Sequence, residues 1–220
     1  MIETFFNPEI IAAAYPIVLS GLLNTILLSL LVVPLGFAGG MILALLASAR
    51  QPWVRWPLMA WVDFFRAFPP LVLLIFLFAG LPFAGLELGG FTCVAIAFFL
   101  NTGSYYGEIL RAGIESIPRG QVEAARSTGL TGFQSMTYIV MPQALRLTVA
   151  PLTNRTIAIT KGTALGTVVA LHEILGMASS AVSNSYNPSP LMMGAAAYLA
   201  LFLPVVVLAR WIETRFAWKR

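Results

Sequence analysis

Residue types that could carry out catalysis or hold a metal are scarce in this sequence. His172 is the only histidine, Glu173 follows it, and Cys93 is the only cysteine. A lone histidine lacks the second ligand or the nucleophile that metal or hydrolytic chemistry needs, and one cysteine cannot form an intrachain disulfide. We therefore predict no catalytic residue and no metal site, and a structural or gating role for the His172–Glu173 pair.

Two cations lie in a mostly apolar segment, 147–171. A charged residue in the middle of a membrane span costs about 2.5–3.5 kcal/mol on insertion scales, so both are functional candidates. Arg155 can extend back toward the membrane interface, which favours a structural role. Lys161 lies deeper and favours a water-lined pathway, which makes Lys161, Gly162 and Thr163 candidate solute contacts.

A second polar group contains Asn101 and Tyr105, which are four residues apart and share one helix face. These two side chains have two possible roles, which the sequence does not separate. They either form hydrogen bonds to a neighbouring helix, worth about 0.6 kcal/mol on average in membranes, or contact a solute. Two further pairs, each three residues apart, can anchor helix ends: Glu108 with Arg111, and Asp63 with Arg66.

The elements that position these residues are predicted to be membrane helices. The 220-residue chain is 59% hydrophobic and 10% charged, whereas soluble domains carry about 25% charge, and its mean hydropathy is +0.86. This composition predicts an all-α integral membrane protein. The pI near 9.6 does not indicate nucleic-acid binding, because the basic residues are scattered between apolar segments.

Five spans are predicted, at about 21–48, 57–80, 91–110, 147–171 and 191–210, in a single domain covering 1–220. The first uncharged run, 10–49, would be about 60 Å long as one helix, twice the thickness that a bilayer needs. We therefore expect the part before residue 21, with Pro16, to lie along the surface as an interfacial or lead-in segment.

Glycine pairs four residues apart recur along the chain, and this spacing permits close helix contact within a subunit or across a dimer. The pairs are Gly36/Gly40, Gly85/Gly89, Gly103/Gly107 and Gly162/Gly166. Close approach of helix backbones is therefore expected in the first, third and fourth spans.

The cations gather on one side of the predicted spans. Eleven of the thirteen lie in or beside the first loop, the third loop and the C-terminal end: Arg50, Arg55, Arg66, Arg111, Arg119, Arg126, Arg146, Arg210, Arg215, Lys219 and Arg220. Cytoplasmic loops carry such an excess, so the N-terminus is predicted outside and the C-terminus in the cytoplasm, as five spans require. The acids Glu3, Glu9, Glu87 and Glu173 are expected on the opposite face.

The long third loop carries signals for two short helices joined at a sharp corner. Residues 121–127 are good helix formers, and Gly129 can take the left-handed conformation that ends a helix. The stretch Thr131–Gln134 makes a capping box for the second helix, which Pro142 can interrupt or kink. Residues 116–142 are named the loop hairpin.

The loop hairpin is predicted to expose Glu123 beside the small residues Ala124 and Ala125, so that a groove in another protein can approach its backbone. Composition leaves such docking and simple packing on the membrane surface equally open. Its motif is more specific: Glu123-Ala124-Ala125, three residues, Gly129, nine residues, Ile139, one residue and Met141-Pro142. This pattern is similar to the EAA loop of ABC-importer membrane subunits, although the family usually has leucine at position 141.

The resemblance covers about residues 20–215. VDFFRAFPPLVLL at 62–74, LNTGSYYGEILRAGIESIPRGQ at 100–121 and LPVVVLARWIE at 203–213 look like the polar amino-acid uptake branch of that family, the histidine- and glutamine-type permeases. The likeness implies transport of amino acids or close analogues across the bacterial cytoplasmic (inner) membrane.

The resemblance also implies partners. Glu123, Ala124, Ala125 and Gly129 would seat the loop hairpin in a cleft of cytoplasmic ABC ATPase subunits, which bind ATP and Mg²⁺. Consistent with this, the chain lacks the G-x-x-x-x-G-K-[ST] loop that cradles nucleotide phosphates and needs no cofactor of its own. The other implied partners are a second permease chain, identical or related, an extracytoplasmic solute-binding protein and membrane lipid.

One departure from the resembled branch bears on the solute. The stretch that typically reads Lys-Asp-Thr-Ser-Leu begins here with Lys161 and Gly162, so a carboxylate is missing. Lys161 then needs another anion, from a neighbouring helix or from the solute itself. The resulting hypothesis is transport of acidic, neutral or modified amino acids in preference to cationic ones.

Two other classes of function compete with this interpretation. An ion-gradient-driven secondary transporter or channel favours buried acidic relays or inverted repeats, and neither is apparent in the sequence. An intramembrane enzyme needs a motif such as H-E-x-x-H or G-x-S-x-G, and neither occurs. The sequence therefore favours an ATP-driven permease.

Overall fold

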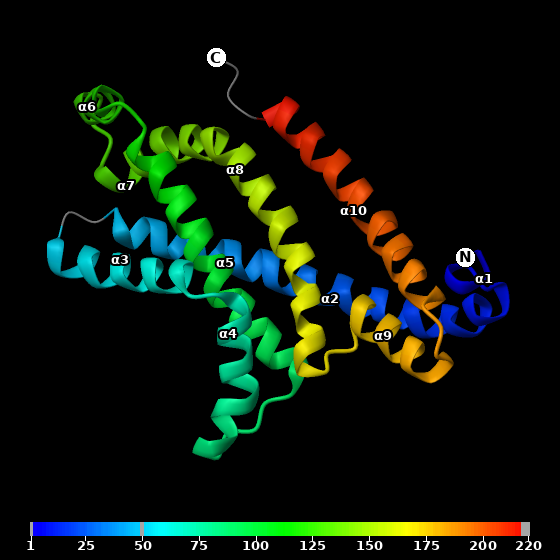
Figure 1. Cartoon of the computed structure of the whole chain (residues 1–220). Coiled ribbons are helices and arrows are strands. Elements are labelled where there is room, and N and C mark those ends of the chain that lie inside the picture. Colours follow the sequence, from blue (N-terminus) through cyan, green and yellow to red (C-terminus); the bar gives the residue numbers. More distant parts are fainter. Residues whose placement is uncertain (1, 49–50, 217–220) are drawn as a thin grey trace. The chain divides into compact units, whose positions relative to one another are not determined.

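The structure is a computed structural model that describes residues 2–48 and 51–216. Every regular element in these two ranges is a helix, in agreement with the predicted all-α class. In chain order (Figure 1) the elements are α1 (Ile2–Phe5), α2 (Pro8–Ala47), α3 (Pro52–Ala67), α4 (Pro70–Ile75), η1 (Phe76–Gly80), η2 (Leu81–Ala84), α5 (Gly90–Glu115), α6 (Arg119–Ser127), α7 (Gly132–Gln134), η3 (Ser135–Val140), α8 (Met141–Gly162), η4 (Thr163–Val169), α9 (Ile174–Ser185) and α10 (Ser189–Phe216). Elements η1 and η3 are π-helices, and η2 and η4 are 3₁₀-helices.

Helix α2 is longer than the first predicted span. Asn7 caps its start, since the side-chain oxygen of Asn7 accepts hydrogen bonds from the backbone N–H groups of Glu9 and Ile10 at 3.0 and 3.3 Å. The helix then continues for 40 residues with Pro16 and Pro34 inside it. The lead-in expected before residue 21 is therefore not a separate element, because each proline removes only one backbone donor from a long helical run.

The predicted span 57–80 is not one continuous helix. Helix α3 ends before Phe68 and α4 begins after Pro69. A proline disfavours the α conformation of the residue before it, and Pro69 and Pro70 donate no backbone N–H, so the helical ladder cannot continue. The breaker expected at Gly80–Pro82 lies instead inside helical structure, where a π-helix passes into a 3₁₀-helix.

The predicted span 147–171 is also not one regular α-helix. Helix α8 ends at Gly162, and a 3₁₀-helix follows to Val169 before Ala170 adopts a φ of 53°. Helix α9, for which the sequence predicts no separate element, ends at Ser185, and Tyr186 follows it with a φ of 51°. The third and fifth predicted spans lie inside α5 and α10.

By length and composition, α2 and α10 are the two helices among the described residues that can cross a membrane. The number rises to four if two interrupted pairs each count as one span: α3 with Pro70–Ala84, and Gly132–Val169 with α9. Helix α5 is not among them because polar side chains fill its second half. Five spans and the orientation of the termini therefore stay predictions.

The described residues form two compact units, and the division falls within α2, α5, α8 and α10. The first unit is drawn from 1–34, 68–99 and 157–207, and its apolar core joins Val18 of α2 to Ile174 and Ala178 of α9. The second unit is drawn from the described residues of 35–67, 100–156 and 208–216. Its core consists of Ala44, Leu110, Ile114, Ile117, Val140 and Ala144.

Glycines bring α2 and α5 into close contact inside the second unit. A side-chain carbon at Gly36 would lie 2.4 Å from Cγ2 of Thr102, and one at Gly40 would lie 2.7 Å from the backbone nitrogen of Gly107. Both distances are steric overlaps, so larger residues would force the helices apart. The expected glycine-mediated contact is thus present between these two helices of the same chain.

Candidate functional site

The loop hairpin has the predicted order of helix, corner and second helix. At the end of α6, the Gly129 N–H donates to the carbonyl oxygen of Arg126 at 3.1 Å. The Leu130 N–H donates to the carbonyl oxygen of Ala125 at 3.3 Å, which completes a Schellman motif. Gly129 has a φ of 90°, a conformation that side chains other than hydrogen rarely permit. The corner therefore depends on this glycine.

The predicted capping box is confirmed at the start of the second helix. Oγ1 of Thr131 accepts from the Gln134 N–H at 3.2 Å, and the Thr131 N–H donates to Oε1 of Gln134 at 2.8 Å. The expected interruption at Pro142 is wrong, because helical structure runs without a break from α7 through η3 into α8. The π-helix η3 directly precedes Pro142, and its wider turn is the local departure from α geometry.

The motif residues of α6 differ in their solvent exposure. Glu123 and Ala124 are exposed, as predicted. Ala125 is only 6% exposed, so the prediction that it lies at the surface is wrong. Ala125 shares the inner helix face with Val122, which packs on the core of the second unit. The sequence reasoning also missed Phe133 of α7, an aromatic side chain that is 80% exposed in the loop hairpin.

Asn101 and Tyr105 meet around Arg155 in the second unit. Asn101 is 2% exposed, its Nδ2 donates to the carbonyl oxygen of Phe65 at 2.9 Å, and its Oδ1 accepts from Nη2 of Arg155 at 2.6 Å. The guanidinium carbon of Arg155 lies 3.5 Å from the centre of the Tyr105 ring. The Tyr105 hydroxyl donates to the carbonyl oxygen of Arg66 at 3.2 Å. A hydrogen bond and a cation–π contact thus hold Arg155 in place.

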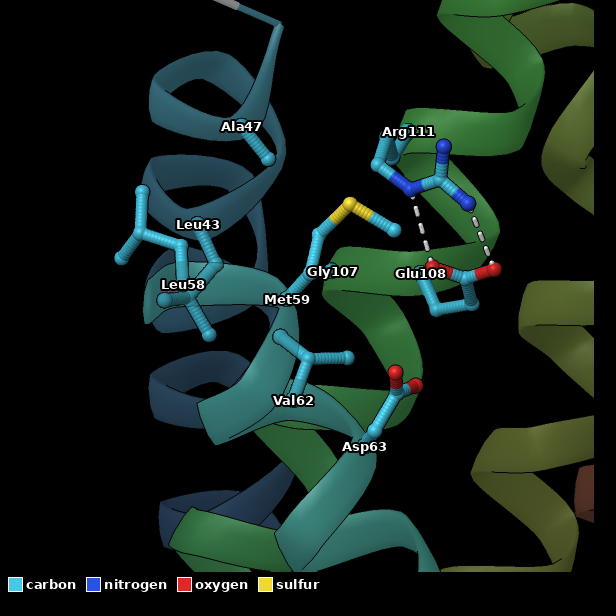
Figure 2. Close-up of a pocket in the computed structure, with 9 residues that line it drawn as sticks. All are labelled: Leu43, Ala47, Leu58, Met59, Val62, Asp63, Gly107, Glu108 and Arg111. Carbon is cyan, nitrogen blue, oxygen red and sulfur yellow. Dashed lines mark hydrogen bonds and ion pairs between the residues drawn. The ribbon is translucent and has the colours of Figure 1, made fainter. Parts of the chain in front are cut away.

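Both predicted anchor pairs are confirmed. Arg111 donates from Nε and Nη2 to the two carboxylate oxygens of Glu108 at 2.9 and 2.8 Å (Figure 2). Arg66 lies 3.5 Å from Asp63. The hollow beside Glu108 and Arg111 in Figure 2 has a volume of only about 10 Å³, the space that one water needs. It is therefore too small for a solute.

Lys161 belongs to the first unit, where its Nζ lies 5.8 Å from the centre of the Phe202 ring. The side chain lines a mostly apolar hollow of about 480 Å³ together with Tyr198 and Leu203. Within the described residues, no carboxylate oxygen lies within the 4.0 Å ion-pair distance of Lys161. The neighbouring helix thus supplies no counter-ion to this cation in the structure.

The two residues after Lys161 are held by packing. A side-chain carbon at Gly162 would lie 2.9 Å from Cε1 of Phe98, so an aspartate at this position would have to displace the ring. Thr163 is fully buried, and its hydroxyl donates to the carbonyl oxygen of Thr160 at 2.7 Å. The Phe98 ring therefore leaves no room for a carboxylate side chain at position 162.

Glu173, which is expected on the outer side of the membrane with the other acids, is fully buried at the start of α9. The side of the membrane on which it lies stays a prediction. Four groups donate hydrogen bonds to its carboxylate: the backbone N–H of Leu175 at 2.9 Å, the backbone N–H of Gly176 at 2.6 Å, the Thr167 hydroxyl at 2.5 Å and the Tyr198 hydroxyl at 2.6 Å. The available signal was an acidic residue directly before an apolar helix, which is an N-terminal capping pattern.

Comparison with known proteins identifies the family. Residues 36–218 match the family described as "Binding-protein-dependent transport system inner membrane component". The chain belongs to this family. A permease of this family is the transport subunit of an ABC transporter, and a partner subunit handles ATP.

Relatives match most of the length of this permease. It is 34% identical over 173 residues to the probable amino-acid ABC transporter permease protein YckA of Bacillus subtilis (strain 168), covering 79% of this chain and 76% of the relative. It is 30% identical over 210 residues to the probable glutamine ABC transporter permease protein GlnM of the same organism, covering 95% and 97%. Its fold matches an amino acid ABC transporter crystallised with histidines with a TM-score of 0.85 and 30% identity, over 93% of this permease and 96% of that chain.

The sites of this permease fall in different units. The second unit contains the loop hairpin and the group of Asn101, Tyr105 and Arg155. The first unit contains Lys161–Thr163 and the buried Glu173. Each site is thus complete within the unit that holds it.

Proposed function

We propose that this permease is the membrane-spanning subunit of an ATP-driven importer of amino acids or close analogues in a bacterial cytoplasmic (inner) membrane. The observation that carries the proposal is the loop hairpin, in which exposed Glu123 and Ala124 precede the glycine corner at Gly129. The likeness to amino-acid ABC transporter permeases supports the solute class. It also favours ATP as the energy source over an ion gradient.

The proposed assembly has two permease chains, identical or related, because one chain of about five spans is too thin to enclose a route for a polar solute. An extracytoplasmic solute-binding protein delivers the cargo. Cytoplasmic ATPase subunits bind ATP and Mg²⁺ and receive the loop hairpin through the exposed Glu123 and Ala124, while the buried Ala125 and the corner at Gly129 hold the shape of the hairpin. Closure of the ATPases moves the hairpins and the attached helices, so that the pathway opens to each side of the membrane in turn.

The proposed topology has five spans, with the N-terminus outside and the C-terminus in the cytoplasm. Helices α2, α5 and α10 supply three spans, and the two interrupted pairs supply the others. In the polar half of α5, Asn101, Tyr105 and Tyr106 form hydrogen bonds within the chain, which lowers the cost of placing these three side chains in a membrane. The excess of cytoplasmic cations supports this orientation. Three of these cations, Arg50, Lys219 and Arg220, lie outside the described residues.

The function is tested with the complex of this permease and its ATPase, purified together and placed in proteoliposomes. We expect ATP hydrolysis that the cargo-loaded solute-binding protein stimulates, accompanied by ATP-dependent uptake of an amino acid. An ion-gradient transporter would instead accumulate solute in vesicles that contain this chain alone, without ATP. Uptake by the chain alone would therefore overturn the proposal.

We further propose that Asn101, Tyr105, Lys161, Gly162 and Thr163 lie along the solute pathway and disfavour cationic solutes. Lys161 has no carboxylate partner among the described residues, and Phe98 occupies the space that an acidic side chain at position 162 would need. A cationic solute would meet the charge of Lys161 without compensation. A solute with a carboxylate or a neutral side chain avoids this repulsion.

This preference predicts slow uptake of arginine and lysine by the same proteoliposomes. We expect glutamine and glutamate to be taken up faster than either cationic amino acid, because only the cationic side chains are repelled by Lys161. The measurement is initial uptake of each radiolabelled amino acid at equal concentration. Arginine or lysine transport at least as fast as that of the other two would refute the preference while leaving the ATP-driven function intact.

A further inference from the structure

Arg155 is the surplus cation in a group of otherwise paired charges in the second unit. Three carboxylates meet three arginines through contacts of at most 3.7 Å: Arg55 with Glu115, Arg111 with Glu115, Arg111 with Glu108, Arg66 with Glu108, and Arg66 with Asp63. Among the residues that the structure describes, Arg155 has no carboxylate within 4.0 Å. Its charge is therefore held in a partly buried place without an anion.

The support around Arg155 fixes the guanidinium without neutralising it. Asn101, which is 2% exposed, uses both ends of its amide: Oδ1 accepts from Arg155 and Nδ2 donates to the backbone of Phe65. The face of the guanidinium rests on the Tyr105 ring at 3.5 Å. Amide and ring together hold the side chain in one orientation, yet both partners are neutral. The site is thus preorganised and remains cationic.

A second guanidinium lies near the same ring but already has carboxylate partners. The guanidinium carbon of Arg66 lies 5.5 Å from the centre of the Tyr105 ring, and Arg66 contacts Asp63 and Glu108 at 3.5 and 3.7 Å. Arg155 is therefore the guanidinium at this ring that lacks a carboxylate among the described residues. A guanidinium in this state favours an anion with more than one acceptor oxygen.

We infer that the Arg155 guanidinium, supported by Asn101 and Tyr105, is a receptor for a carboxylate group of the transported solute. A carboxylate offers two parallel acceptors that match the fork of a guanidinium, and it supplies the counter-ion that the described residues do not provide. This inference rests on the proposed import function and adds to it a specificity-determining residue. The group bound is either the α-carboxylate, which all amino acids share, or a carboxylate in the solute side chain.

The test measures binding of four probes to the purified permease–ATPase complex without the solute-binding protein. Glutamate carries both carboxylates, glutamine only the α-carboxylate, 4-aminobutanoate only the side-chain carboxylate, and 4-aminobutanamide neither. If Arg155 binds the α-carboxylate, the wild-type complex binds glutamate and glutamine. If it binds the side-chain carboxylate, the complex binds glutamate and 4-aminobutanoate. In both cases 4-aminobutanamide does not bind.

We expect Arg155→Gln to weaken binding of the recognised carboxylate probes by about 10-fold or more, because a charge-assisted bidentate pair is lost. Arg155→Lys keeps the charge without the fork and is expected to lose less. Arg146→Gln is the matched control, since Arg146 is an exposed arginine on the same helix. Binding is expressed per folded complex, with the thermal unfolding midpoint measured alongside.

Unchanged binding by Arg155→Gln, or a lowered unfolding midpoint with unchanged binding per folded complex, would show that Arg155 is only a brace for Asn101. Failure of the wild-type complex to bind any carboxylate probe would overturn the inference as well. Stimulation of ATP hydrolysis by the solute-binding protein is recorded on the same preparations. If that stimulation persists when the carboxylate binding fails, the receptor role is wrong and the import function stands.

Discussion

Replacing Gly129 by valine is expected to abolish ATP-driven uptake while the chain still inserts into the membrane. The φ of 90° at Gly129 places a β-branched side chain in a conformation that costs of the order of 1–3 kcal/mol, so the corner rearranges. The Schellman hydrogen bonds at the end of α6 then break, and the exposed Glu123 loses its fixed position relative to the second helix of the loop hairpin. The measurement is uptake by proteoliposomes with equal amounts of inserted variant and wild-type complex.

Two variants control for this result. Gly129→Asn is expected to retain much of the uptake, because asparagine tolerates positive φ far better than valine does. Gly89→Val introduces the same side chain at an exposed glycine where an added carbon meets nothing within 4 Å, and it is expected to behave as wild type. Normal uptake by Gly129→Val would show that the corner does not transmit the movement of the ATPase.

Replacing Glu173 by alanine is expected to cost about 3–5 kcal/mol of stability. The carboxylate is fully buried and accepts all four of its hydrogen bonds from groups within the first unit, including two backbone N–H groups at the start of α9. Removing it takes the acceptor away from four part-buried donors at once. The free energy of unfolding is measured by denaturant titration of the purified chain in detergent micelles.

A graded variant and a control make the test of Glu173 specific. Tyr198→Phe removes a single donor to the carboxylate and is expected to cost only about 1 kcal/mol. Glu87→Ala removes an exposed acid and is expected to leave the unfolding free energy within about 0.5 kcal/mol of wild type. A Glu173→Ala variant as stable as Glu87→Ala would contradict the buried network.

The parts of the fold that follow from local chemistry were predictable from the sequence. The corner at Gly129 and the Thr131–Gln134 capping box each depend on a few neighbouring residues, so their sequence pattern is sufficient. The break at Pro69 was equally local, but the strong apolar run around it concealed the signal. Long apolar helices such as α10 were found from length and hydropathy alone.

The chemistry of the candidate sites depends on contacts between distant residues, which no local pattern specifies. Arg155 donates a hydrogen bond to Asn101, which lies 54 positions away in the chain, and Tyr198 donates one to Glu173, which lies 25 positions away. The sequence marked Arg155 as costly in a membrane but not as a cation stacked on Tyr105. Likewise, the crowding of Gly162 by Phe98 became visible only when α5 and α8 were in place.

The uninterrupted helical stretch that begins at Gly132 has a mechanical consequence. Its axis passes from the second half of the loop hairpin to Arg155, roughly 35 Å at 1.5 Å per residue. Under the proposed coupling, a displacement of the loop hairpin is transmitted along this helix toward Arg155. The π-helix η3 and Pro151 are the two places where the helix departs from regular α geometry and can bend. Converting η3 into a regular α-helical turn would change how much of the hairpin's displacement reaches Arg155, without altering a residue at either end of the stretch.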